Sequence, residues 1–151
     1  MNEYYFHTLD VREAFRADAE EIFSNEQIYE ELGCEVYVLA GSNKKSTSFP
    51  CIYTEITNAP TASEHSSNTE IQRFTDFTLT FDIYSKDLEA YNQDDAVVRL
   101  SEILVQNLQK KYHSLTVTLN QPLPNMDQTV SRWQVRFRGT FDNGNNFIYS
   151  D

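Results

Sequence analysis

Positive charge is scarce in this sequence of 151 residues. Only 12 Lys and Arg oppose 23 Asp and Glu, which gives a formal net charge of −11 at pH 7 and an isoelectric point near 4.6. This balance argues against sequence-independent binding to nucleic acid, because such binding depends on Lys and Arg displacing counterions from phosphates. Glycine and proline are also few, with four of each, which excludes collagen-like, linker-like and disordered compositions.

Long apolar runs and export signals are missing too. No apolar segment approaches the roughly 20 residues that a membrane-spanning helix needs, so we expect no membrane partner. Residues 1–6 contain no basic stretch followed by an apolar run, and we therefore expect no secretory signal. The two cysteines, Cys34 and Cys51, stand alone in apolar stretches. This placement favours buried, reduced thiols over a disulfide, and maturation in a reducing cytoplasm.

What the sequence does contain suits one packed domain. Apolar residues make up 40% of the chain, including 10 Phe and 9 Tyr. A chain of this length buries roughly 70% of the surface that its unfolded form exposes. A core can therefore form without metal or disulfide staples. We expect a single domain over residues 1–151, in which residues 1–33 form an acidic helical segment.

The first helix is predicted over residues 10–32. Its apolar residues recur at three- and four-residue steps: Val11, Ala14, Phe15, Ala19, Ile22 and Phe23. Asp10 is the predicted N-cap, with Glu13 three residues later completing an arrangement like a capping box. Gly33 is expected to end the helix. A break into two helices is possible near Ser24–Asn25.

Six strands are predicted from alternating or β-rich segments at residues 35–39, 49–56, 74–84, 114–119, 130–141 and 147–149. In the third segment, alternate residues 77, 79, 81 and 83 are apolar, which is typical of a sheet with one buried face. In the fourth segment, Leu115, Val117 and Leu119 are expected to share one face. Residues 121–127 are predicted to form a turn.

A second long helix is predicted between Asp94–Asp95 and Lys110–Lys111, because acids favour a helix N-terminus and bases favour a C-terminus. Its expected buried residues are Val97, Leu100, Leu104 and Leu108, joined by Val98, Val105 and Tyr112. The predicted order is therefore α-β-β-β-α-β-β-β. This order indicates an α+β fold with an antiparallel or mixed β-sheet and two main helices packed on one face.

No pattern in the sequence points to catalysis. His7, His65 and His113 have no second ligand at the spacing that metal sites use, and the four isolated glycines form no phosphate-binding loop. Residues 142–146 faintly resemble a calcium-binding loop but lack its closing acid, so a hairpin turn is favoured. We predict no catalytic, cofactor-binding or metal-binding residues, no cofactor, and no enzymatic activity.

Charges of opposite sign gather on two different elements. Arg132, Arg136 and Arg138 lie on the polar face of one predicted strand, whereas the first helix is strongly acidic and includes Glu20 and Glu21. These groups can pair within one chain, remain solvated, or join neighbouring copies. In the last case one patch docks on a different patch of the next copy. Such heterologous contacts produce rings where the rotation closes.

Three stretches occur in an order that resembles a known family: SFPCIYTEITN at residues 48–58, FTLTFDIYS at residues 77–85 and QPLPNMDQTVSRW at residues 121–133. On these motifs the chain resembles the tail terminator, or head–tail joining, proteins of tailed bacteriophages. The resemblance implies a homo-oligomeric ring, commonly a hexamer, that caps the tail tube protein in the virion neck. It further implies contact with a head connector or stopper protein, DNA that only passes through the lumen, and assembly in the host bacterial cytoplasm.

The polar loop at residues 58–69 fits this resemblance as an arm that reaches an adjacent subunit or the lumen. Its candidate interface residues are Glu64, His65 and Asn68. An acidic lumen would repel DNA and let it slide. Other functions are left open: a different neck component such as a connector or stopper, a small host-directed binding module, or a small hydrolase or nuclease. The last would need a catalytic constellation that the sequence lacks.

Overall fold

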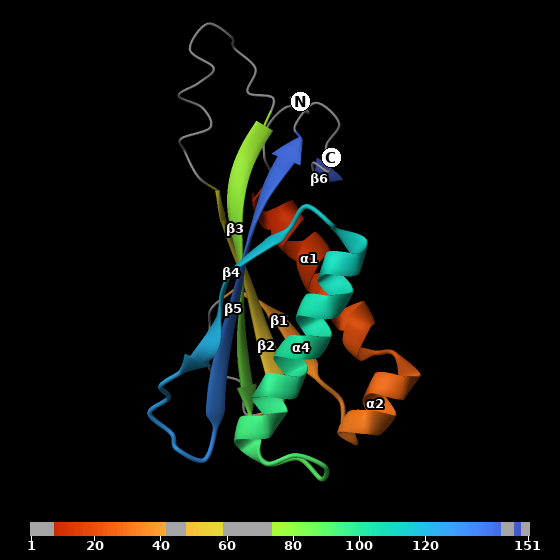
Figure 1. Ribbon diagram of the computed structural model, residues 1–151, viewed down its shortest axis with the longest axis vertical. Helices are drawn as coiled ribbons and strands as arrows, with labels where there is room; N and C mark the ends of the chain where they lie inside the picture. The colour runs from red at the N-terminus through yellow and green to blue at the C-terminus, as the bar shows by residue number, and fades with distance from the viewer. Residues whose placement is uncertain (1–7, 42–47, 59–73, 143–146, 149–151) are drawn as a thin grey trace, which may run out of the picture.

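The computed structural model describes residues 8–41, 48–58, 74–142 and 147–148. Its helices pack on one face of a six-stranded mixed sheet (Figure 1). The strands are β1 (Tyr37–Ala40), β2 (Cys51–Asn58), β3 (Phe74–Ser85), β4 (Thr116–Leu123), β5 (Ser131–Asp142) and β6 (Phe147–Ile148). They lie in the order β1-β2-β3-β5-β4, and β6 pairs with β5. Strands β1 and β2 are parallel, and the other pairs are antiparallel. The predicted α+β class is therefore confirmed.

The predicted first helix is divided into α1 (Thr8–Phe23) and α2 (Glu26–Leu32). The break falls at the predicted place, because the Asn25 side chain accepts hydrogen bonds from the backbone N–H groups of Gln27 and Ile28 in the first turn of α2. Gly33 ends α2 in the left-handed conformation, with φ at 75°. The prediction of Asp10 as N-cap is wrong. The helix already begins at Thr8, and the Glu13 carboxylate bonds to Arg16 rather than back to the helix start.

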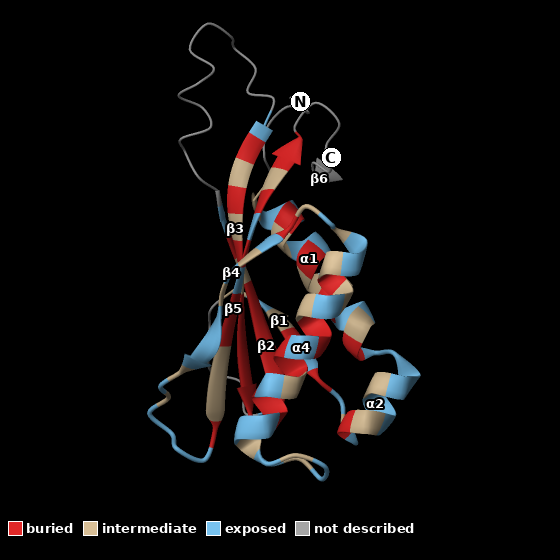
Figure 2. Ribbon diagram, viewed as in Figure 1, coloured by how far each residue is buried: buried red, intermediate tan, exposed pale blue. Residues whose placement is uncertain are grey.

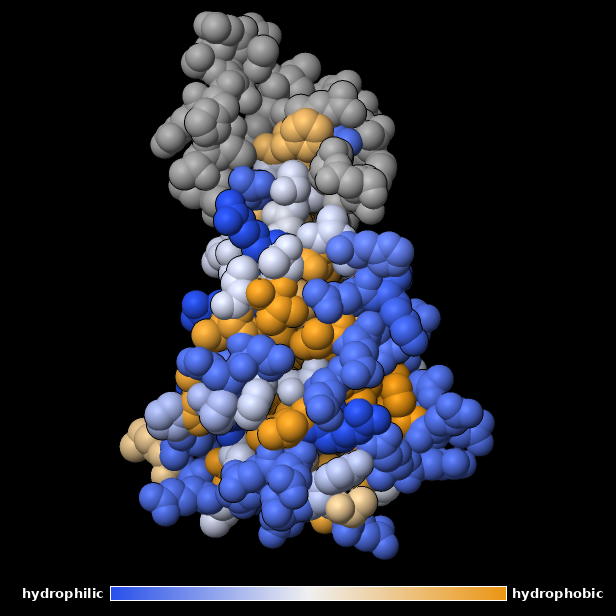
Figure 3. All heavy atoms as spheres, viewed as in Figure 1, coloured by the Kyte–Doolittle hydropathy of each residue, from blue (hydrophilic) through white to orange (hydrophobic). Residues whose placement is uncertain are grey.

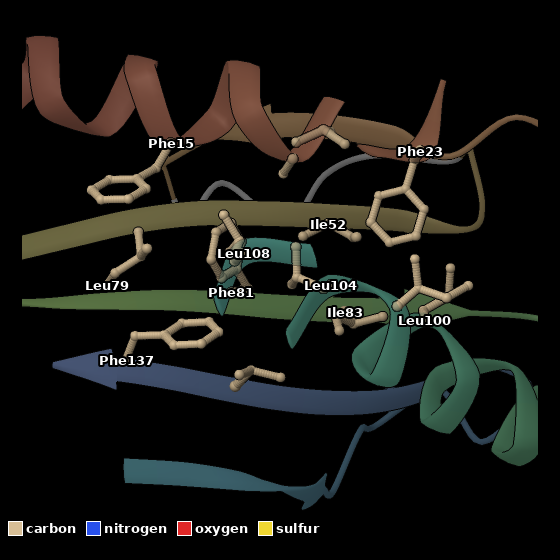
Figure 4. Packing of buried hydrophobic residues seen from close by; sticks show 14 of the residues in the cluster. Phe15, Phe23, Ile52, Leu79, Phe81, Ile83, Leu100, Leu104, Leu108 and Phe137 are labelled. Atoms are coloured by element: carbon tan, nitrogen blue, oxygen red, sulfur yellow. The ribbon is translucent and has the colours of Figure 1, made fainter. Parts of the chain in front are cut away.

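A single large core lies between the helices and the sheet (Figure 4). Helix α1 contributes Val11, Phe15, Ala19 and Phe23, and α4 (Gln93–Lys111) contributes among others the predicted Val97, Leu100, Leu104 and Leu108. These side chains meet the inward residues of β2, β3 and β5. Ala14 and Val98, also expected on the buried stripes, are exposed because both point away from the sheet.

Buried residues recur along the central strands (Figure 2), and on the outward face they include Cys51, Tyr53 and Tyr84 near one end of the sheet and Asp142 near the other. The alternation predicted for β3 holds over most of the strand, with Phe77, Leu79, Phe81 and Ile83 on the helix side. Tyr84, on the opposite face, is also buried, because it packs with Cys51, Tyr53 and Val130 in a second small cluster. The outer face is thus partly apolar at this end and exposed at Arg136 and Arg138.

Strand β4 differs from its prediction in length and in register. It continues through Pro122 to Leu123, where a turn was expected. Proline, which has no backbone N–H, is tolerated there because β4 lies at the edge of the sheet, next to β5. A bulge between Val117 and Leu119 places Val117 opposite the inward Phe137 but Leu119 opposite the outward Arg136. Leu115, Val117 and Leu119, which were expected to share one face, therefore do not do so.

Candidate functional site

The face of the sheet opposite the helices is not covered by any helix that the structure describes (Figure 1). Arg136 and Arg138 project from it, because the alternate residues Val135 and Phe137 are buried in the core on the helix side. The register places Arg136 opposite Thr80 of β3. Both arginine side chains are exposed, and within the described part of the chain neither forms an ion pair. We call Arg136 and Arg138 the arginine pair.

Arg132, the third predicted interface residue on β5, is engaged within its own chain. Its Nε and Nη2 atoms lie 3.2 and 2.9 Å from Oδ1 of Asp82, to which Gln134 Nε2 also donates at 3.0 Å. The guanidinium carbon lies 5.6 Å from the centre of the Tyr84 ring. Asp82 and Gln134 are both buried, so this network stabilises the sheet and leaves Arg132 less available to a partner.

Much of the negative charge of the N-terminal helices is also neutralised locally. Asp18 of α1 accepts hydrogen bonds from Lys111 Nζ and the Tyr112 hydroxyl, each at 2.6 Å. These bonds join α1 to the end of α4. Burial and the hydrogen bond to Asp18 raise the pKa of Tyr112, so its hydroxyl stays protonated and donates.

A second ionic link joins α2 to α4. Glu31 accepts hydrogen bonds from Arg99 Nε at 2.6 Å and Nη2 at 3.0 Å, and from the Tyr91 hydroxyl at 2.7 Å. The hydrogen bonds from Arg99 and Tyr91 lower the pKa of Glu31 from 4.5 to about 2. This bidentate geometry is among the stronger kinds of ion pair. It holds the short helix α2 against the rest of the fold.

The remaining predicted interface residues lie apart from the arginine pair. Glu20 and Glu21 are exposed on α1, on the helix side of the sheet, and Glu20 bonds to Arg16 at 2.7 Å. No ion pair among the described residues joins either acid to Arg136 or Arg138. Pairing of these acids with the arginine pair inside one chain is therefore not seen. Glu64, His65 and Asn68 lie outside the described residues.

Metal sites, reactive cysteines and membrane spans each require particular features of the metal-ligating side chains, the thiols and the helices. No group of three or more His, Cys, Asp or Glu side chains within them is placed to hold a metal ion. Cys34 is a free thiol, and burial raises its pKa, which lowers its reactivity. No helix in the described ranges combines the length and apolar character needed to cross a bilayer. The notable feature is thus a surface with two differently charged regions.

Sequence reasoning found the arginines but missed the Asp82 network that separates Arg132 from the other two. The sequence does place an acid, Asp82, on the polar face of β3. To predict its contact with Arg132, however, the register of β3 against β5 must be known. The helix side is mostly hydrophilic on its visible face (Figure 3). No known protein family and no curated protein matches this sequence.

Proposed function

We propose that this chain is a structural virion protein of a tailed-bacteriophage neck, in which copies form a ring that caps the tail tube. In this role it acts as a tail terminator and joins the tube to the head connector or stopper. The proposal rests on the resemblance of three sequence stretches and on one structural observation. That observation is the separation of the exposed arginine pair, on the uncovered sheet face, from the exposed acids Glu20 and Glu21 of α1, on the helix side.

Two unlike patches on different sides of one chain favour heterologous contacts. In such a contact the basic patch of one copy meets the acidic patch of the next, and repetition of the step closes a ring when the rotation allows it. Complementary charges set the register of the copies and disfavour wrong pairings. The local ion pairs at Asp18 and Glu31 keep the acidic helices fixed on the body, which limits the entropy lost on assembly.

The net charge of −11 suits a ring through which DNA passes without binding. An acidic channel repels the phosphate backbone, and this repulsion weakens as salt screens it. A ring whose inner wall is positively charged would contradict this part of the proposal.

Deletion of the gene from the phage genome tests the proposed function. A terminator deletion should give filled heads without tails, together with free tail tubes of uncontrolled length, in electron micrographs. A connector or stopper deletion should instead give tails of normal length that fail to join heads. Labelled antibodies should place the protein at the neck of intact virions. Virions that lack the protein would refute a structural role, and turnover of a compound by the purified chain would favour an enzyme.

A further inference from the structure

A groove of about 340 Å³ lies at the sheet edge, between β1 and the break that separates α1 from α2. Its floor is apolar, with the buried side chains of Phe23, Val36 and Val38. Two tyrosines line it as well, and they are unusually exposed for large side chains: Tyr29 at 49% and Tyr37 at 40%. The groove also has two carboxylates in its lining, those of Glu20 and Glu35.

Glu20 and Glu35 are the acidic members of the groove lining, and both are exposed. Glu20 contacts Arg16, but 60% of its side chain is accessible. Exposed aromatic rings beside carboxylates form an environment that suits a guanidinium group. The planar cation stacks on an aromatic ring while its N–H groups donate to carboxylate oxygens. Tyr and Arg are also the residues that most often dominate the binding energy of protein interfaces.

We propose that this groove receives Arg136 and Arg138 from a second copy of the chain. The inference deepens the proposed function, since it names the contact from which the ring would be built. The arginine pair supplies the required chemistry, because it is exposed and makes no ion pair within the described part of its own chain. The acidic, aromatic groove supplies the complement.

The geometry prevents one chain from satisfying itself. Strands β2 and β3 separate β1 from β5, so the two patches are about 14 Å apart across the sheet at the usual strand spacing. The arginine pair also faces away from the helices, whereas α1 and α2 form one side of the groove. The contact therefore joins two copies, and in the proposed ring it is heterologous, with the groove of one copy on the uncovered sheet face of the next.

Docking of side chains is favoured here over pairing of strand edges. The outer edge strand β4 carries a bulge at Val117/Leu119 and a proline at residue 122, both of which interrupt a hydrogen-bonding edge. At the other edge, β1 has only four residues, and Arg16 Nη1 donates to the Val38 carbonyl oxygen at 3.3 Å. Both edges are therefore poor templates for an added strand.

Two charge-reversed variants test the contact by sedimentation velocity and negative-stain microscopy. R136E/R138E should lose self-association by about tenfold or more, and E20K/E35K should do the same. An equal mixture of the two variants should restore rings in which the variants alternate. In such a ring the acidic patch of R136E/R138E meets the basic groove of E20K/E35K, and the unchanged arginine pair of E20K/E35K meets the unchanged groove of R136E/R138E. Alternation closes a ring only when the number of subunits is even. K86E/K110E changes the net charge as R136E/R138E does, at exposed positions outside both patches, and should assemble as the wild type does.

The tyrosines supply a separate readout. Y29F/Y37F keeps both ring faces and should retain assembly, whereas Y29A/Y37A should weaken it by about tenfold or more. Rings that form equally well from R136E/R138E would overturn the contact and leave the neck function standing. A wild-type chain that stays monomeric at millimolar concentration would also overturn the contact. Virions without the protein would instead overturn the neck function and leave a measured contact between copies intact.

Discussion

Replacement of Gly139 by alanine probes a tightly packed point of the core. Gly139 lies on β5 opposite Phe77 of β3, on the side that faces the helices. A Cβ atom built there would lie 2.6 Å from Phe77 Cζ and 2.8 Å from Leu115 Cδ2. Both neighbours are buried, with 1% and 2% of their surfaces exposed, so neither side chain can swing into solvent. The strand or its neighbours must shift to admit a single methyl group.

The cost follows from the size of that shift. Over-packing of a filled core typically destabilises a protein by 1–3 kcal/mol, so we expect G139A to lower the free energy of unfolding by about 2 kcal/mol. For a chain of this length, that change corresponds to a decrease in Tm of about 4–8 °C. Thermal and urea unfolding followed by circular dichroism measure both quantities.

A double-mutant cycle with F77L separates crowding from other effects. Leucine lacks the Cζ atom that the new methyl group would strike, so G139A should cost less in the F77L background than in the wild type. Gly41, at a φ of 81°, provides the control. G41A is strained in the backbone by about 1 kcal/mol, and F77L should leave that cost unchanged. A G139A protein as stable as the wild type, or a cost that F77L does not reduce, would refute the packing argument.

Three further predictions concern Glu31, Asp82 and the two cysteines. The pKa of Glu31 is lowered from 4.5 to about 2, so its ionised form stabilises the fold fully above about pH 4.5, and that stability is lost as the pH falls through 2. The E31Q variant should therefore lose about 1 kcal/mol of unfolding free energy at pH 7, after allowance for solvent screening, and its profile of Tm against pH should be flatter below pH 4.5. Parallel profiles for E31Q and the wild type would contradict the link between this ion pair and stability. D82N should lower the free energy of unfolding by about 1–3 kcal/mol in urea titrations, because the charged acceptor of Arg132 is removed, and an unchanged midpoint would contradict this. Iodoacetamide should label Cys34 slowly in the native protein, because burial raises the pKa of its thiol. Cys51 is 1% exposed and should be labelled only after unfolding, which peptide mass spectrometry can measure. Fast labelling of Cys51 in the native protein would contradict its burial.

The periodic parts of the fold could be predicted from the sequence. The apolar stripe of α4 and the alternation in β3 are long enough to fix element type and the buried face, and both predictions are confirmed. The extent of β4 could not be predicted, since Pro122 usually interrupts a strand and is accepted here only because it lies at an edge. The bulge in β4 likewise depends on its partner strand rather than on local sequence.

The candidate interface was only partly accessible to sequence reasoning. The alternation of β5 places Arg136 and Arg138 on the polar face, as predicted. It could not reveal that Asp82 holds Arg132, because that contact joins residues 50 positions apart. The groove at β1 combines Tyr29, Tyr37 and two acids from three separate segments, so no local pattern announces it. The arm predicted at residues 58–69 lies outside the described residues except for Asn58, the last residue of β2.

The position of β5 between β3 and β4 has a consequence for folding of the protein during its synthesis on the ribosome. This interior strand is among the last parts to be synthesised, whereas α1, one of the two helices that cover the core, is among the first. Until residue 142 has left the exit tunnel, Phe15 and Phe81 have no complete environment in which to bury. Nascent chains should therefore expose apolar surface throughout translation and depend on holdase chaperones until the final segment emerges.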